Sequence, residues 1–271
     1  MKISPSIYKN NINFSARKKE IREADKIARK SREVFPMLSQ TYIDTFYKTA
    51  RDTSPNSINV IVKSNEMFRQ IDIMRDLAKY PDEYNIEIPE LEKNTLYAIN
   101  LNGIKQMKIG NCQENAMAAV ATLCANGYTN SERADLVYKI DFINKETKEV
   151  EDTTNYPLDH AFAITDMNKG GKQDIVIDPW LGFADSKSGA IARFKQMYDE
   201  KDYKKALAIS TTLFCCGNKM TKKEFEEKYE VKAHMDFVSQ NKYTTTYEKK
   251  RLGEYALLMY NNILINKHKQ G

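Results

Sequence analysis

Three short segments carry residue types that can do chemistry together: Gly110-Asn111-Cys112, Asp159-His160 and Asp178-Pro179-Trp180. A thiol, an imidazole and a carboxylate are the parts of a nucleophile, a base and a group that orients the base. In that scheme Asp178 holds the imidazole of His160. His160 pairs with the thiolate of Cys112 and later gives its proton to a leaving group. The sequence therefore predicts nucleophilic catalysis by Cys112.

The expected position of Cys112 at the start of a helix supports this role. Apolar residues at helical spacing predict a helix that opens at Asn111 or Cys112 and ends at Gly127, where the lack of a side chain suits a left-handed cap. In the first turn of a helix, free backbone N–H groups and the positive end of the helix dipole stabilise a thiolate. The thiolate, rather than the thiol, is the nucleophile.

His160 and Asp178 are expected on neighbouring strands. Strand-like runs cover residues 136–143, 161–165 and 174–177, with turn residues at 144–145 and 168–171. If the last two runs form a hairpin around the 168–171 turn, His160 at the start of one strand and Asp178 at the end of the next lie opposite each other or nearly so. One of these residues could then orient the other.

Each of the three residues also has a purely structural interpretation. A lone helical cysteine among Ala and Met usually belongs to the core, as we expect for Cys124. A histidine that starts a strand is often a hydrogen-bonded structural residue, and an aspartate before proline is usually a turn former. The conjunction of all three in one pattern favours the catalytic interpretation.

The motifs resemble those of papain-like (transglutaminase-fold) cysteine enzymes, in which Cys, His and Asp or Asn follow in this order. The matching residues are Gly110-Asn111-Cys112, Asp159-His160-Ala161 and Asp178-Pro179-Trp180-Leu181-Gly182, within roughly residues 104–183. The resemblance implies a central helix that bears the nucleophile and packs on an antiparallel sheet. It also implies that Trp180 shields the bond between Asp178 and His160.

The same resemblance assigns donors for the developing oxyanion. Gln106, six residues before Cys112, and the backbone N–H of Cys112 are expected in that role. An exposed loop amide is the alternative interpretation of Gln106. Glu114 recurs in one branch of the family, and we expect it to have a structural role, because a carboxylate in the first helical turn is favoured by the helix dipole.

Within the family, the run Gly-Asn-Cys-Gln-Glu-Asn-Ala at residues 110–116 looks most like bacterial effectors and toxins. That branch includes proteases, glutamine deamidases and transglutaminases that act on host proteins. No Trp follows Cys112, and the 48-residue interval to His160 is short for the classical peptidases. Simple digestive proteolysis is therefore not the expected activity.

Several outcomes share the same acyl chemistry. If the acyl group on Cys112 is transferred to water, the enzyme is a protease or a glutamine deamidase. If it is transferred to a lysine amine, the enzyme is a transglutaminase. Arylamine N-acetyltransferases, which transfer an acyl group to a small molecule, use the same residue order, usually with the nucleophile nearer the start of the chain. A non-catalytic partner-binding protein with a buried, inert Cys112 is the alternative from another class.

The expected fold class is α+β, in three parts. Residues 1–15 are expected to form a disordered leader, residues 16–93 a helical N-terminal region for partner recognition or delivery, and residues 94–271 a papain-like catalytic domain. Helical periodicity is expected over the segments 17–33, 38–50, 64–77, 190–198, 222–229 and 248–266, with a boundary in 81–92. A possible strand at 213–216 would bury Cys215 and Cys216.

The composition of the chain excludes several other classes of protein. With 271 residues, of which 41% are hydrophobic and 29% charged, the chain is expected to be globular, and four cysteines do not make a disulfide framework. No apolar run reaches the length of a membrane span, and no apolar stretch typical of a secretory signal follows Met1. We therefore expect a cytoplasmic protein in the producing cell. A specialised secretion system could export it into a host cell.

The net charge of +5 is concentrated near the N-terminus. Residues 1–34 hold ten Lys and Arg and four Asp and Glu. A solvated helix face explains this pattern, and contact with nucleic acid or an anionic membrane is the alternative. We expect a protein substrate, and no metal or nucleotide, because the chain has no Cys-x-x-Cys, no pair of His at ligand spacing and no Gly-rich phosphate loop.

Overall fold

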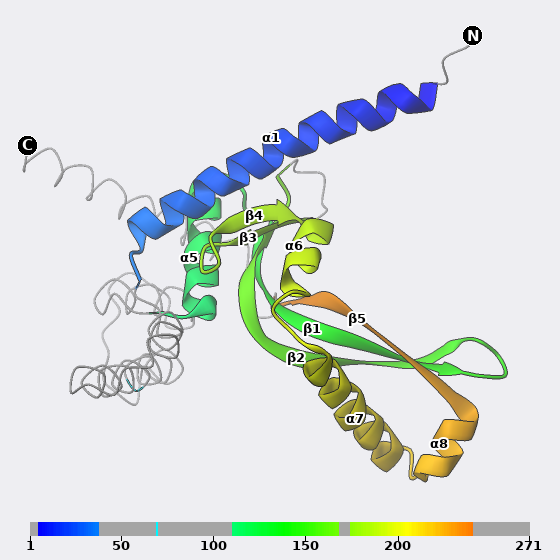
Figure 1. The fold of residues 1–271 in the computed structure, drawn as a ribbon. Coiled ribbons are helices and arrows are strands. Elements are labelled where there is room, and N and C mark those ends of the chain that lie inside the picture. The colour runs from blue at the N-terminus through cyan, green and yellow to red at the C-terminus, as the bar shows by residue number, and fades with distance from the viewer. Residues whose placement is uncertain (1–4, 38–68, 70–109, 168–173, 241–271) are drawn as a thin grey trace, which may run out of the picture. The chain divides into compact units, whose positions relative to one another are not determined.

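The computed structural model describes residues 5–37, 69, 110–167 and 174–240 (Figure 1). These residues form an α+β fold, as expected, with one antiparallel five-stranded sheet in the order β4-β3-β2-β1-β5. The elements are α1 (Pro5–Val34), α5 (Cys112–Ala125), β1 (Ser131–Asn144), β2 (Val150–Thr165), β3 (Ile175–Asp178), β4 (Phe183–Ser186), α6 (Lys187–Phe194), α7 (Glu200–Gly217), α8 (Lys222–Lys228) and β5 (Tyr229–Ser239).

The chain divides into two compact units. Unit 1 comprises Met1–Arg133, Phe162–Ser186 and Gln240–Gly271, and unit 2 comprises Ala134–Ala161 and Lys187–Ser239. Helices α1 and α5 and strands β3 and β4 belong to unit 1. Helices α6, α7 and α8 and strand β5 belong to unit 2, and strands β1 and β2 run through both units.

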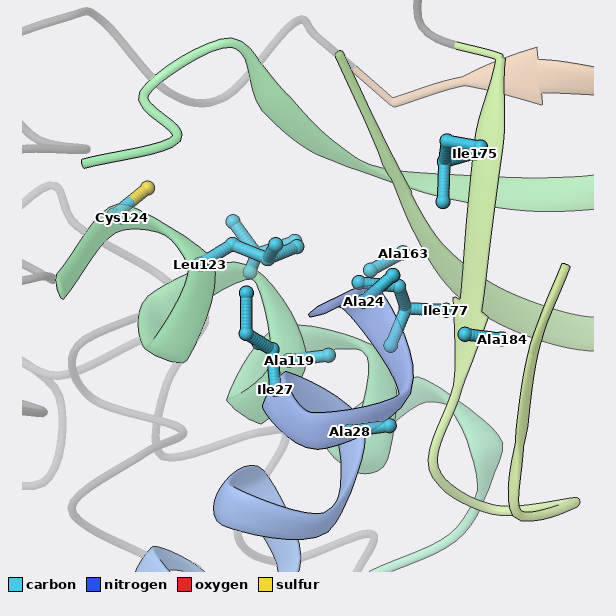
Figure 2. Packing of buried hydrophobic residues seen from close by; sticks show 11 residues of the cluster. Ala24, Ile27, Ala28, Ala119, Leu123, Cys124, Ala163, Ile175, Ile177 and Ala184 are labelled. Atoms are coloured by element: carbon cyan, nitrogen blue, oxygen red, sulfur yellow. The ribbon is translucent and has the colours of Figure 1, made fainter. Parts of the chain in front are cut away.

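The core of unit 1 lies between α1, α5 and the strands β2, β3 and β4 (Figure 2). Ala24, Ile27 and Ala28 recur at helical spacing on α1 and face Leu123 of α5 and Ile177 of β3, among others. The small alanine side chains let the helix approach closely. The helix that precedes the expected catalytic domain thus shares a core with the helix that bears Cys112. It begins at Pro5, inside the segment 1–15 predicted as a disordered leader.

The hairpin expected around the 168–171 turn is present as an antiparallel pair. Ala163 of β2 pairs with Ile177 of β3, and Thr165 pairs with Ile175. Strand β4 then pairs with β3 on its other side, with Asp178 opposite Phe183. Asp178 is therefore the last residue of β3, as predicted from the sequence.

Unit 2 is built on the long strands β1, β2 and β5. Strand β1 pairs with β5 from Ala134↔Ser239 to Asn144↔Tyr229, and the turn expected at residues 144–145 follows β1. Helices α7 and α8 pack on these strands through an aromatic cluster, in which the rings of Phe142 and Phe214 are stacked at 4.2 Å. The cluster is completed by Phe225 and Tyr229.

The possible strand at 213–216 is wrong, because these residues end helix α7. The buried positions of α7, which are Ala206, Ser210 and Phe214, are spaced by four residues, and residues at that spacing share one face of a helix. Cys215 is consequently half-buried and Cys216 exposed, whereas a strand was expected to bury both. The segments 38–50, 64–77, 81–92, 168–171 and 248–266, for which elements, a boundary or a turn were predicted, lie wholly or mainly outside the described residues.

Candidate functional site

Cys112 is the first residue of α5, where the sequence predicted it. Asn111 is the N-cap residue in extended conformation, with a φ of −101°. Its backbone N–H donates a 2.9 Å hydrogen bond to the carboxylate of Glu114, which is fully buried, and its carbonyl accepts one from the side-chain amide of Asn115, also at 2.9 Å. These bonds fix where the helix starts. Glu114 therefore has the structural role expected of it.

Close packing makes a glycine necessary just before this cap. A Cβ atom on Gly110 would lie 2.6 Å from the Cβ of Glu114 and 2.6 Å from the sulfur of Met37. Both distances are far below ordinary van der Waals contact. Gly110 thus lets the chain enter α5 against the buried Glu114.

The four cysteines occupy different electrostatic surroundings. Cys112 is half-buried in the first turn of α5, and Cys124 is buried near the end of the same helix. Cys215 and Cys216 lie in the last turn of α7, at the negative end of the helix dipole. Cys112 alone among the four combines partial access with a helix N-terminus.

Asp178 is almost fully buried, at 1% exposed, and closes the turn that follows β3. Its Oδ1 accepts a 3.0 Å hydrogen bond from the backbone N–H of Leu181, and its carbonyl accepts one of 2.8 Å from Gly182. Asp178 is thus also the turn former that the sequence offered as an alternative. The residue belongs to unit 1, and its strand packs against α5, the helix of Cys112.

His160 lies inside β2 rather than at the start of a strand, because β2 begins at Val150. Its side chain is 3% exposed, whereas the neighbouring Asp159 is exposed, which follows the alternation of a half-buried strand. The imidazole meets the ring of Phe194 edge to face at 5.1 Å. Phe194, on α6, in turn contacts Phe237. The histidine ring is therefore held by aromatic packing within unit 2.

The structure brings Cys112 and Asp178 into one compact unit, and His160 belongs to the other. The convergence of all three side chains therefore stays a prediction. Gln106, the predicted oxyanion donor, lies outside the described residues. A groove of about 770 Å³ lies between α7 and α8 in unit 2, and its walls include Cys215 and Cys216 but none of the three predicted catalytic residues.

One side chain that the sequence did not single out, Arg32, contacts the turn after Asp178. Arg32 of α1 donates hydrogen bonds to the carbonyls of Pro179 and Trp180. Its guanidinium also lies against Gly182, where an added Cβ would be 3.0 Å from one guanidinium nitrogen. Arg32 is one of several basic residues in its helix, and no local pattern distinguishes it from the others.

Among the described residues, no group of three or more His, Cys, Asp and Glu side chains is arranged to hold a metal ion. No helix in the part of the chain that the structure describes is long and apolar enough to span a membrane. Comparison of the chain with models of known protein families, with curated proteins and with solved structures gives no match.

Proposed function

We propose that the chain is a cysteine-dependent acyl-transfer enzyme with a papain-like arrangement of Cys112, His160 and Asp178. Its proposed reaction is on an amide of a protein substrate, as a glutamine deamidase or a protease. The observation that carries this proposal is the place of Cys112 at the first position of α5, whose start is fixed by the buried Glu114. A helix N-terminus favours the anionic sulfur and supplies a backbone N–H toward an oxyanion that forms beside it.

The arrangement of β2 and β3 supports the roles of His160 and Asp178. Extending the observed register by one pair sets Asp178 opposite Phe162. Alternate residues of a strand share a face, so His160, two residues before Phe162, lies on the same face of β2 as Phe162. In the proposed arrangement, Asp178 at the end of β3 orients the imidazole of His160.

The proposed reaction has two halves. The sulfur of Cys112 bonds to the amide carbonyl carbon, and the oxyanion is held by the N–H of Cys112 and, by resemblance, by Gln106. The C–N bond then breaks, and ammonia or an amine leaves with the proton of His160. Water next gives a proton to His160 and attacks the thioester, so that the C–S bond breaks and a carboxylate product leaves. A lysine amine in place of water gives a crosslink.

Mass spectrometry of a host-cell lysate treated with the protein tests the proposal. Wild type is compared with Cys112→Ala and with Cys216→Ser, a matched control that removes an exposed thiol from a helix C-terminus. New peptide termini identify a protease, Gln-to-Glu conversion a deamidase, and Gln-to-Lys crosslinks a transglutaminase. We expect the products with wild type and Cys216→Ser only. Products that persist with Cys112→Ala, or none with any variant, contradict the proposal.

Thiol labelling supplies a test that needs no substrate. Below about pH 7, Cys112 is expected to react with iodoacetamide faster than the other three cysteines, although Cys216 is more exposed. The reason is that the first turn of α5 stabilises the thiolate and the last turn of α7 does not. Equal rates at Cys112 and Cys216 favour the non-catalytic partner-binding protein.

A further inference from the structure

The turn that follows Asp178 is held from outside by the guanidinium of Arg32. The Nε atom donates to the carbonyl of Pro179, and the Nη2 atom donates to the carbonyl of Trp180 at 3.3 Å. Arg32 lies on α1, 147 residues away from Pro179 in the chain, and all of these residues belong to unit 1. The planar fork of an arginine can bridge two consecutive carbonyls in this way, whereas a lysine ammonium cannot match it.

Asp178 holds the same turn from inside. Its carboxylate accepts from the N–H of Leu181, and its carbonyl accepts from the N–H of Gly182. Gly182 has a φ of +79°, a conformation that favours glycine, and its lack of a Cβ leaves room for the guanidinium of Arg32. The carboxylate and the guanidinium therefore fix one turn of five residues between them. Movement of either group is expected to disturb the other.

Packing of α1 determines where Arg32 lies. Ala24, Ile27 and Ala28 are buried in the core of unit 1, and Arg32 follows Ala28 by one helical turn. Helix α1 contacts α5, β3 and β4. Packing of α1 in the core therefore places the guanidinium of Arg32 beside the turn.

We propose that Arg32 is a positioning residue for Asp178, so that docking of α1 on α5, β3 and β4 is a condition for activity. This inference rests on the proposed function. Asp178 orients the imidazole of His160, and that imidazole stabilises the thiolate of Cys112. Without Arg32 the turn relaxes and the imidazole loses its orientation. In general, an imidazolium beside a cysteine favours the thiolate at acid pH, whereas at alkaline pH a thiolate forms without that help.

The test measures the alkylation rate of Cys112 by iodoacetamide on the full chain, followed by mass spectrometry, from about pH 6 to about pH 9. At the acid end we expect Arg32→Ala to react about 10- to 100-fold more slowly than wild type, and at the alkaline end equally fast. Added guanidinium ions restore the acid rate. Arg32→Lys loses part of it. Arg29→Ala is the control, because Arg29 is exposed on the same helix and pairs with Asp25.

Amide hydrogen exchange at Leu181 and Gly182 reports on the turn independently of Cys112. We expect faster exchange in Arg32→Ala than in Arg29→Ala. If wild-type Cys112 does not react at the acid end, the proposed function fails and this inference falls with it. If wild type reacts and Arg32→Ala keeps both the acid rate and the protection of the two amides, this inference alone is overturned. Arg32→Lys and Gly182→Ala disturb the same contact and replace Arg32→Ala if that variant does not fold.

Discussion

Replacement of Gly110 by alanine tests how the start of α5 is built. The new Cβ would lie 2.6 Å from the Cβ of Glu114 and from the sulfur of Met37, where ordinary contact is 3.4–4 Å. The sulfur is the far end of a flexible side chain and can move. The Cβ of Glu114 cannot, because it is attached to the helix backbone, so the chain must shift and strain the bond between Glu114 and Asn111. Overpacking of this kind costs about 1–3 kcal/mol.

Thermal and urea unfolding measure this loss of stability and compare it with that of alanine variants at two other glycines. For a chain of this size, each 1 kcal/mol lowers the melting temperature by about 2–4 °C. Gly217→Ala is the matched control, because nothing lies within 4 Å of its added Cβ at the end of α7. It is expected to be neutral or to stabilise by up to about 1 kcal/mol. Gly127→Ala adds only the strain of a φ of +84°, about 1 kcal/mol.

The order of the three variants decides the interpretation. We expect Gly110→Ala to be the least stable, followed by Gly127→Ala and then Gly217→Ala. Equal stability of Gly110→Ala and Gly217→Ala would refute the close packing of Glu114 against the chain before the helix. Glu114 would then not fix the start of α5, and with it the position of Cys112.

Three further predictions concern the core, the charge pairs and the thiols. Ile177→Ala should destabilise unit 1 by about 2–5 kcal/mol in urea unfolding, because its side chain is fully buried; a loss below about 1 kcal/mol argues against that core. Burial raises the pKa of Asp236, but hydrogen bonds from Lys187 and from a backbone N–H outweigh burial and hold the pKa below its usual value. The charged Asp236 therefore stabilises the fold above its unfolded-state pKa, and this contribution is lost as pH falls through the folded-state pKa. Between about pH 5 and pH 2, wild type should lose more stability than Asp236→Asn. Parallel stability curves for the two proteins contradict this. Cys112→Ala should fold with wild-type stability, as circular dichroism can check, so that its loss of activity reports on chemistry; unfolding of this variant contradicts the assignment.

Local signals in the sequence were sufficient to predict the helix of Cys112 and the hairpin that ends at Asp178. Asn111 and Glu114 act on the first turn of the helix, and Gly127, with its positive φ, acts just after the last turn. The strands β2 and β3, both expected from their apolar runs, likewise pair antiparallel. Such features can be read from the sequence because the interactions that produce them are short-range.

Other elements depend on contacts that no local pattern records. The end of α7 contains apolar residues that suit a strand, but burial of Phe214 against Phe142 decides in favour of a helix. The first part of β2 is polar and largely exposed, so the start of the strand at Val150 gave no alternating signal. Arg32 acts across 147 residues of chain. These features follow from tertiary packing, which overrides local propensity.

Chemical crosslinking tests whether Cys112 and His160 share one site. A bifunctional reagent such as 1,3-dibromoacetone joins a thiolate to an imidazole only when both lie within the reach of its three carbon atoms. We predict a single Cys112–His160 crosslink in the mass spectrum of the digested wild-type protein, and no such link in His160→Ala. Reagent attached to Cys112 alone in wild type, or joined from Cys112 to another residue, would contradict a shared site.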